Sequence, residues 1–255
     1  KYESRIEQNI NKILELLYRK KQKATFFSLG WIARKYPNII NAIDSYGHEI
    51  GSHSDMHQLA YQQSKLEFRD DLQRSIYSIE NITGKKVKIY RAPGFSLIEK
   101  NKWVFEELIK EGIEIDCSIF PAKRAHGGYD RFLSDNPSIV DINGLLIKEF
   151  PINLYKVYTQ KFIYSGGGYF RLLPYFLIKQ MMKKSKYVMT YFHPRDFDIN
   201  QPIISDLNKI RRFKSYYGIK NCLIKLEKLI SDFSFINLED ADSLVEWEKA
   251  EKIRI

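Results

Sequence analysis

The chain has 255 residues, a formal net charge of +10 at pH 7, 44% hydrophobic residues and 28% charged residues. This composition is typical of a soluble globular protein with a substantial core, and it excludes a low-complexity or disordered chain. Two cysteines are too few for a disulfide scaffold, so we expect reduced thiols. No apolar run approaches the length of a membrane span.

The basic residues raise the question of nucleic-acid binding, because they gather in clusters such as 19–21, 183–184 and 211–212. Each cluster ends a helical pattern, where cations suit the helix dipole, and no nucleic-acid motif accompanies them. A nucleic-acid-binding protein is an alternative that depends on charge alone, and we expect no nucleic-acid partner. We interpret the clusters as solvated faces, oriented toward an anionic membrane surface or polymer. Without a signal peptide, we expect a cytoplasmic protein or one peripheral to the inner membrane.

Helices and strands alternate with short links through the first half of the chain. Apolar periodicity predicts helices over residues 3–21, 32–46, 64–82 and 99–111, and strands over 24–29, 48–53, 87–90 and 113–118. Gly47 is placed to end the second helix, and Ser64 with Glu67 forms a capping-box pattern for the third. This alternation predicts an α/β fold in which helices cover a parallel sheet.

The pattern loosens after residue 122. We expect a strand at 145–150 among turns, a helix at 172–183 and a buried strand at 187–192. Beyond residue 205 follow two helical patterns and a short strand at 233–237. Without a linker or an internal repeat, the chain is expected to form one domain over residues 1–255, with 205–255 as a helical C-terminal extension.

Three of the five histidines lie within ten residues. His53 and His57 are four residues apart at the end of a predicted strand, so their rings share a face if the segment turns helically. Neutral imidazole suits zinc and other first-row divalent ions. A pair of surface histidines in a polar loop is the alternative. We expect a structural role for His48 and a surface position for His126.

Other polar side chains also follow predicted strands. His53, Arg91 and Asp116 lie at or just beyond three strand ends, and His193 follows the strand at 187–192. In parallel α/β sheets, chemistry gathers at the carboxyl ends of the strands. The sequence therefore predicts a functional site at this edge.

The motifs, taken in order, resemble the polysaccharide deacetylases, the NodB-homology enzymes of carbohydrate esterase family 4. They are His53-Ser54-x-x-His57, Arg91-Ala92-Pro93, Asp116-Cys117-Ser118 and the strand that ends at His193. The resemblance covers essentially the whole chain, and the segment 165–171 and the tail resemble a subgroup found with bacterial exopolysaccharide biosynthesis. It implies an irregular (β/α) barrel. It also implies a hydrolase that removes acetyl groups from N-acetylhexosamine units of a bacterial cell-surface or exopolysaccharide.

The resemblance assigns roles residue by residue. His53 and His57 would bind a divalent metal, with zinc as the default. His193 would protonate the leaving amine, and Arg91 would orient the catalytic carboxylate. Asp116 is a candidate to tune His193, although capping a helix or pairing with Arg91 are alternatives.

The substrate-binding residues implied by the same resemblance are Gly94, Phe95, Tyr169 and Phe170. The backbone N–H of Gly94 would stabilise the oxyanion together with the metal. Tyr169 and Phe170 fit the protein core as well as they fit a wall that stacks on sugar rings.

One departure concerns the first motif of the family, a strand ending in Asp-Asp or Asp-x-Glu-Asp that supplies the catalytic base and the third metal ligand. The chain opens directly on the predicted helix. We expect a barrel without its first strand, and a third ligand from a segment upstream of Lys1. A non-catalytic carbohydrate-binding relative without the catalytic Asp is the alternative.

The metal site leads to a geometric prediction. Asp55 should point away from the face that His53 and His57 share, so it does not replace the missing carboxylate. The two imidazoles should converge on a common point beside Arg91 and His193.

Overall fold

The computed structural model describes residues 4–124, 127–158 and 160–255, and the chain divides into two compact units. Residues 23–153 and 236–255 form the first, which we call the sheet unit, and residues 1–22 and 154–235 form the second, the helical unit. His126 and the first residue of the predicted helix at 3–21 lie outside the described residues. The prediction of one domain over residues 1–255 stays a prediction.

The sheet unit contains a seven-stranded sheet in the order β1-β2-β3-β4-β6-β5-β9. The strands are β1 (Thr25–Ser28), β2 (Glu49–Ser52), β3 (Ile89–Tyr90), β4 (Ile115–Asp116), β5 (Ser138–Ile142), β6 (Leu145–Glu149) and β9 (Glu251–Arg254). Every neighbouring pair is parallel except β5 and β6. The predicted α/β class with a mostly parallel sheet is confirmed.

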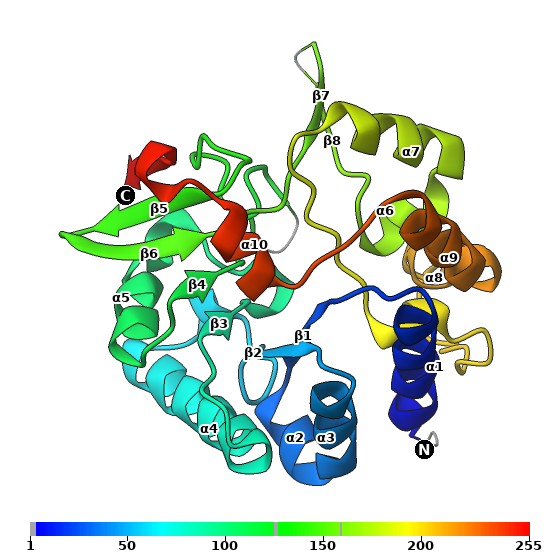
Figure 1. Ribbon diagram of the computed structural model, residues 1–255, viewed down its shortest axis with the longest axis horizontal. Helices are drawn as coiled ribbons and strands as arrows, with labels where there is room; N and C mark the ends of the chain where they lie inside the picture. Colours follow the sequence, from blue (N-terminus) through cyan, green and yellow to red (C-terminus); the bar gives the residue numbers. More distant parts are fainter. Residues whose placement is uncertain (1–3, 125–126, 159) are drawn as a thin grey trace. The chain divides into compact units, whose positions relative to one another are not determined.

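Helices connect the first four strands and form a layer beside them (Figure 1). They are α2 (Gly30–Lys35), α3 (Pro37–Ser45), α4 (Lys65–Thr83) and α5 (Trp103–Lys110). Parallel strands require such crossover connections. The core of this unit lies between sheet and helices, and its fully buried members include Ile40, Leu72, Tyr90, Val104 and Phe105.

Two local sequence signals act as predicted, and one prediction is corrected. Gly47 follows α3 with a φ of +70°, and Ser64 with Glu67 forms the capping box of α4. The single helix predicted over 32–46 is wrong, because it is two helices that meet at Tyr36. Pro37 explains the break, since proline lacks an N–H and disfavours a helical conformation in the preceding residue.

The helical unit is built largely from helices. They are α1 (Ile6–Arg19), α6 (Gly167–Leu172), α7 (Tyr175–Lys184), α8 (Lys209–Tyr216) and α9 (Cys222–Asp232), with the two-stranded sheet of β7 (Tyr155–Val157) and β8 (Gln160–Phe162). The predicted helix at 172–183 begins at Tyr175 instead, directly after Pro174. Helix α10 (Leu238–Leu244) belongs to the sheet unit.

Two predicted strands are wrong, and the strands β5, β7, β8 and β9 were missed. Residues 187–192 form a single parallel bridge, between Tyr191 and Gly166, in place of a strand. Residues 233–237 also form no strand, although all of them are described. Strand β9 was missed because its residues are mostly exposed and carry no alternating apolar pattern.

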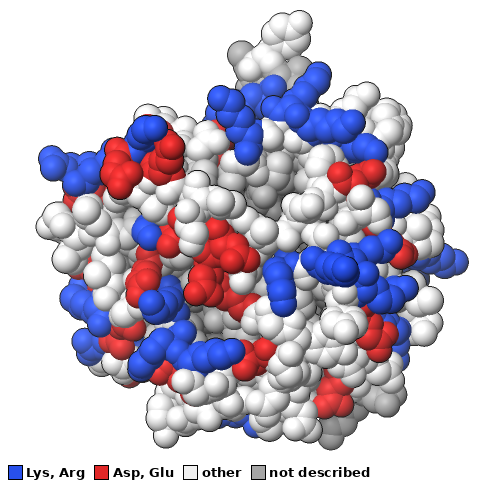
Figure 2. All heavy atoms as spheres, in the orientation of Figure 1, with Lys and Arg blue, Asp and Glu red and all other residues white. Residues whose placement is uncertain are grey.

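The charged residues are distributed in groups of both signs. On the face drawn in Figure 2, Lys and Arg side chains form several groups with acidic side chains between them. None of the helices in the described part of the chain combines the length and apolar character that a bilayer crossing requires.

The contrast between two leucines of α4 tests the core. Leu72 is 1% exposed and Leu66 is 57% exposed. We expect Leu72→Ala to lower the free energy of unfolding by about 3 kcal/mol, since it removes buried methyl groups and leaves a cavity. The matched control Leu66→Ala should change it by less than about 0.5 kcal/mol. Urea unfolding followed by circular dichroism measures both, and equal losses would contradict this core assignment.

Candidate functional site

The register of the parallel strands places the predicted residues of the sheet unit at one edge. Ser52 pairs with Tyr90, and Tyr90 pairs with Asp116, so these residues form one row across the sheet. The next row begins where the strands end. There the N–H of His53 donates to the Ser28 carbonyl at 2.9 Å, and the N–H of Arg91 donates to the Ser52 carbonyl at 3.0 Å.

Successive side chains of a strand point to opposite faces, so the two rows face opposite ways. The row of Ser52, Tyr90 and Asp116 faces the helix layer. The Ser52 hydroxyl lies 2.8 Å from that of Ser75 on α4, and the Tyr90 ring packs on Phe68 of the same helix. His53 and Arg91 belong to the other row. The sequence correctly placed all three predicted residues at the edge, but it did not separate the two faces.

His53 and His57 lie beside each other, although not through a helical turn. The segment that joins them is a loop in which Ser54 and His57 have positive φ values of 72° and 60°. The Ser54 hydroxyl accepts the N–H of His57 at 2.9 Å and tightens the loop. The two imidazole centroids lie 5.2 Å apart in an edge-to-face arrangement. The segment does not turn helically, yet the two rings lie beside each other, and the convergence of their nitrogens on one common point stays a prediction.

A backbone carbonyl fixes the orientation of the His53 ring. Its Nδ1 lies 2.6 Å from the carbonyl oxygen of Arg91. A carbonyl oxygen only accepts, so Nδ1 carries the proton and Nε2 carries the lone pair. This arrangement is typical of metal-binding histidines, which donate one ring N–H to a carbonyl or carboxylate and coordinate through the other nitrogen.

Asp55 points away from the two imidazoles, as predicted. It is buried and forms a bidentate ion pair with Arg34 on α2, with N–O distances of 2.6 and 3.0 Å. Its backbone N–H donates to Asp71 on α4 at 2.6 Å. These bonds fix the loop between the histidines to the helix layer.

Arg91 is a buried cation with an incomplete set of partners. Its side chain is 8% exposed, and its guanidinium carbon lies 4.2 Å from the ring centroid of Phe27. Its Nε donates to the Cys117 carbonyl at 3.1 Å. The Nη2 atom is buried and has no hydrogen-bond partner among the described residues. An unmatched buried guanidinium donor favours an additional carboxylate at this point.

Asp116 is fully buried, and its carboxylate is bound by residues of the sheet unit. Its carboxylate accepts the hydroxyl of Ser118 at 2.6 Å and the N–H of Ser118 at 3.0 Å. Its register partner on β6 is Glu149, which is also fully buried. The role of Asp116 as a tuner of His193 stays a prediction, while these contacts favour a structural role.

Burial favours a proton on the pair formed by the Asp116 and Glu149 carboxyls. Burial raises the pKa of Glu149 well above its ordinary value of 4.5, and the adjacent Asp116 raises it further. Burial also raises the pKa of Asp116, against the lowering effect of its hydrogen bonds to Glu149 and Ser118. Among the described residues Glu149 Oε2 has no hydrogen-bond partner.

The pair supports the loop that carries Arg91. Ser118, held by Asp116, accepts the N–H of Ala92 at 2.7 Å. Gly94 follows in a short 3₁₀ turn with a φ of 63°, and a Cβ at this position would lie 2.9 Å from Leu59. Phe95 is 6% exposed and packs edge-to-face on Phe120. The substrate-binding roles of Gly94 and Phe95 stay predictions.

His48 lies at the other end of β2 from His53. It is buried beside Phe26, and neither ring nitrogen has a hydrogen-bond partner among the described residues. Burial and the charge of Lys23 lower the pKa of His48 to about 4. This neutral ring fits the structural role expected from the sequence.

The remaining predicted residues belong to the helical unit. His193 precedes the 3₁₀ turn η4 (Pro194–Phe197), and its side chain is 59% exposed. Tyr169 is 47% exposed, whereas Phe170 is fully buried and packs on Phe192. Of the two alternatives for Phe170, the structure supports the core. The proximity of His193 to the two metal-binding candidates stays a prediction.

Metal binding can be tested against the donors present. His53 and His57 supply two imidazoles with one ring already oriented for coordination. No group of three or more His, Cys, Asp or Glu side chains able to hold an ion occurs within the described residues. The pair therefore fits two ligands of a divalent ion such as zinc.

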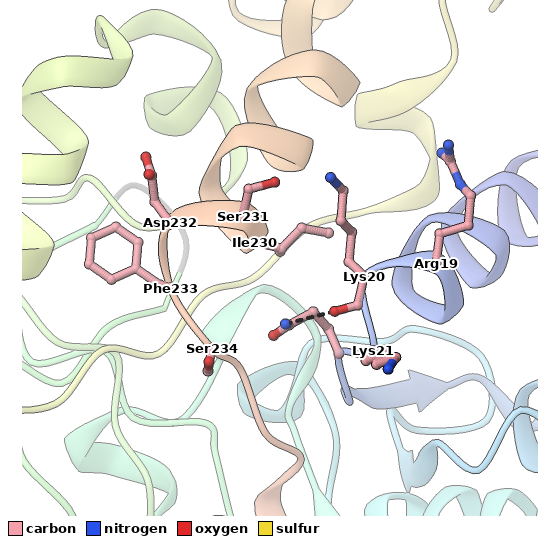
Figure 3. Close-up of a pocket in the computed structure, with 9 residues that line it drawn as sticks. Arg19, Lys20, Lys21, Ile230, Ser231, Asp232, Phe233 and Ser234 are labelled. Carbon is pink, nitrogen blue, oxygen red and sulfur yellow. Dashed lines mark hydrogen bonds between the residues drawn. The ribbon is translucent and has the colours of Figure 1, made fainter.

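A surface hollow of the helical unit lies outside the predicted site. It is lined by residues at and just after the end of α1, including Arg19 and Lys20, and by residues at and just after the end of α9, including Asp232 and Phe233 (Figure 3). None of the predicted catalytic residues lines it. It therefore adds nothing to the candidate active site.

Comparisons with known proteins agree with the motifs. Residues 2–115 match the sequence model of the polysaccharide deacetylase family, and residues 117–242 match a domain of unknown function, DUF3473. The first 115 residues are therefore similar to the polysaccharide deacetylases.

Curated relatives share part of the chain. It is 34% identical over 97 residues to a peptidoglycan-N-acetylglucosamine deacetylase of Bacillus cereus, covering 38% of this chain and 35% of that protein. It is 34% identical over 132 residues to chitin deacetylase 1 of Saccharomyces cerevisiae, covering 50% of this chain and 42% of that protein. The chain thus spans less than half the length of these relatives.

The fold is also similar to solved structures. A protein of Mycobacterium smegmatis assigned as a polysaccharide deacetylase superposes with a TM-score of 0.63 and 18% identity, over 97% of this chain and 80% of that one. A mutant of a carbohydrate esterase family 4 pseudoenzyme from Bacillus anthracis gives a TM-score of 0.50 and 16% identity, over 91% and 62%. These likenesses support the fold class.

The sequence analysis did not identify two buried carboxylates, one near Asp116 and one near His193. Glu149 ends the predicted strand at 145–150, and its position as the register partner of Asp116 depends on strand order, which the sequence does not show. Asp196 lies three residues after His193, a spacing that places a side chain back on the start of a turn. That spacing was the available signal.

The proton on this carboxyl pair predicts how stability depends on pH. Above the ordinary pKa of 4.5, the unfolded chain releases the Glu149 proton while the folded chain keeps it. The folded state then binds more protons, so the free energy of unfolding falls as pH rises through this range, by at most about 1.4 kcal/mol per pH unit. Glu149→Gln has no such proton to release, and its amide can still donate to Asp116.

We therefore expect Glu149→Gln to gain stability relative to the wild type between pH 5 and 8. Urea unfolding at several pH values measures the difference, and the exposed Glu114→Gln serves as the control. Parallel stability curves for wild type and Glu149→Gln would show that Glu149 is ionised in the folded protein.

Proposed function

We propose that this protein is a metal-dependent N-deacetylase of a polysaccharide built from N-acetylhexosamine units. The observation that carries the proposal is the close approach of the His53 and His57 rings beside the Arg91 loop, in a chain whose first 115 residues are similar to the polysaccharide deacetylases. Relatives named as deacetylases of peptidoglycan and chitin support the substrate class.

The reaction is the hydrolysis of an acetamide. Water adds to the carbonyl carbon, the C–N bond breaks, and acetate and a free amine leave. A divalent ion bound by His53 and His57 would polarise the carbonyl and lower the pKa of the attacking water. The Gly94 N–H is the proposed oxyanion donor, and His193 is the proposed acid that protonates the leaving nitrogen.

Arg91 provides a reason to expect a further carboxylate. Its buried Nη2 has no hydrogen-bond partner among the described residues, and two imidazoles alone are a small ligand set for a catalytic ion. We propose that a further carboxylate serves as a metal ligand and a base, and that Arg91 orients it.

The proposal also concerns the identity of the substrate polymer. The segment 165–171 and the tail resemble a subgroup associated with exopolysaccharide biosynthesis, so we propose a bacterial exopolysaccharide as the substrate. Peptidoglycan and chitin oligomers are the comparison substrates. We further propose that the protein works in the cytoplasm or at the inner membrane, where its basic clusters would face anionic lipid.

A non-catalytic carbohydrate-binding protein is the second candidate. The observation in its favour is the lack of a three-ligand cluster within the described residues. The two candidates differ in one measurable property, because a binding protein would retain oligosaccharides without releasing acetate.

Substitution of the paired histidines tests the enzyme proposal. We expect His53→Ala and His57→Ala in the full-length protein each to weaken Zn²⁺ binding at least about 10-fold. Acetate release from N-acetylglucosamine oligomers should fall by about 10³-fold or more, because the ion loses a ligand. Calorimetric zinc titration and an acetate assay measure the two effects separately.

Met56→Ala is the matched control, since Met56 is 54% exposed in the same loop and offers no nitrogen ligand. It should bind zinc and release acetate like the wild type. A full-length protein that binds zinc and oligosaccharide but releases no acetate would support the second candidate and overturn the first.

A further inference from the structure

The turn after His193 brings a buried carboxylate back to the imidazole. Asp196 is 4% exposed, and its Oδ2 accepts the backbone N–H of His193 at 2.9 Å. The same oxygen lies 3.6 Å from Nδ1 of the His193 ring. The ring itself is 59% exposed, so it has one side toward the carboxylate and another toward solvent.

A buried arginine holds the other oxygen of this carboxylate. Arg171 Nε lies 3.1 Å from Asp196 Oδ1, and both side chains are 6% exposed. This contact is an ion pair, and the two Nη atoms of Arg171 donate to the carbonyls of Lys214 and Tyr217 at 2.8 Å and of Ser215 at 3.1 Å. These bonds leave the guanidinium little freedom, so it fixes the position of the Asp196 carboxylate.

Asp196 is ionised in this environment. Burial alone would raise its pKa, but the hydrogen bonds from His193 and the positive charge of Arg171 outweigh burial, so the pKa lies below its ordinary range. Across neutral pH the ring of His193 therefore has a permanent negative charge beside Nδ1.

The turn is also anchored at its far end. Asp198 pairs with Arg5 through N–O distances of 2.7 and 3.0 Å, and Asn9 of α1 donates to it at 3.1 Å. Titratable and charged groups that face the turn come from several segments: Arg5 ahead of α1, Arg171 on α6, Cys222 and Lys225 on α9, and Arg195 and Asp198 on the turn itself. Among them, Asp196 is the anion directed at the imidazole.

We propose that Asp196, held by Arg171, is the positioning residue that orients His193 with its proton on Nδ1 and places a negative charge beside that nitrogen. This inference rests on the proposed deacetylase function. In the acid step, Nε2–H of the imidazolium passes its proton to the leaving nitrogen as the C–N bond breaks and the electron pair moves to nitrogen. The ring becomes neutral, and Asp196 keeps its charge throughout.

The assignment differs from the one that the sequence favoured. Asp116 was the predicted tuner, yet its carboxylate is occupied by Ser118 and lies beside the buried carboxyl of Glu149. Asp196 contacts His193 within one turn of chain and needs no other element to bring it there.

A purely structural role for Asp196 is the competing explanation, because the same oxygen caps the turn through the His193 N–H. Asp196→Asn separates the two roles. The asparagine side-chain oxygen can still accept that N–H, but the charge beside Nδ1 is lost. Asp198→Asn is the matched control, since it weakens the Arg5 anchor of the same turn without contacting His193.

The experiment uses the full-length protein and measures kcat against pH for acetate release, together with the melting temperature. We expect Asp196→Asn to lower kcat about 10- to 100-fold with little change in KM, and to move the high-pH limb about one unit lower. Asp198→Asn should lower the melting temperature and leave that limb in place. A wild-type pH profile in Asp196→Asn would overturn the inference, as would identical changes in the two variants.

A second measurement tests the role of Asp196 even if the protein is not a deacetylase. If the wild type releases no acetate, the C–H resonance of the His193 ring is titrated by NMR, with His193→Gln to assign the signal. The inference then requires the midpoint to move to lower pH in Asp196→Asn and to stay in Asp198→Asn. Coincident titration curves for wild type and Asp196→Asn would overturn it.

Discussion

The alternation of side chains along β2, β3 and β4 decides what each residue at the edge of the sheet can do. Ser52, Tyr90 and Asp116 form one row and face the helix layer, while His53 and Arg91 follow one residue later and belong to the other face. A shift of one residue in any strand would exchange these faces. The same strand register therefore places His53 on one face and the buried carboxyl pair on the other, and a change of register would displace both.

Buried polar groups on the side of the sheet that faces the helices hold the loops that carry the candidate site. A proton on the pair of Asp116 and Glu149 is favoured in their fully buried position, where two separate charges would be costly, and Asp116 holds Ser118, which in turn bonds the Arg91 loop. The ion pair of Asp55 with Arg34 similarly fixes the loop between His53 and His57. The loops of the candidate site are thus fixed by bonds made on the buried side, which is how a site can be ordered before a ligand binds.

Much of this arrangement follows from local signals. Apolar periodicity located β1 to β4 and their helices, and the capping box of α4 and Gly47 marked helix ends, because such signals act within a few residues. The predictions that failed also have physical explanations. Pro37 overrode the apolar pattern of a single helix, and residues 187–192 resemble a buried strand in composition yet form one bridge. The carboxyl pair of Asp116 and Glu149 depends on the pairing of β4 with β6, which no local pattern encodes.

Local and long-range contacts also differ in how reliably they can place a carboxylate beside a catalytic histidine. Asp196 follows His193 by three positions, and its carboxylate accepts the His193 N–H within the same turn, so the geometry of the pair depends on local chain structure. A carboxylate that reaches a histidine from a distant strand depends on every element between them. The contacts with His193 and the ion pair with Arg171 together keep the pKa of this buried carboxylate below its ordinary range, against the effect of burial. The turn fixes the position of Asp196, and these contacts keep it charged beside the imidazole.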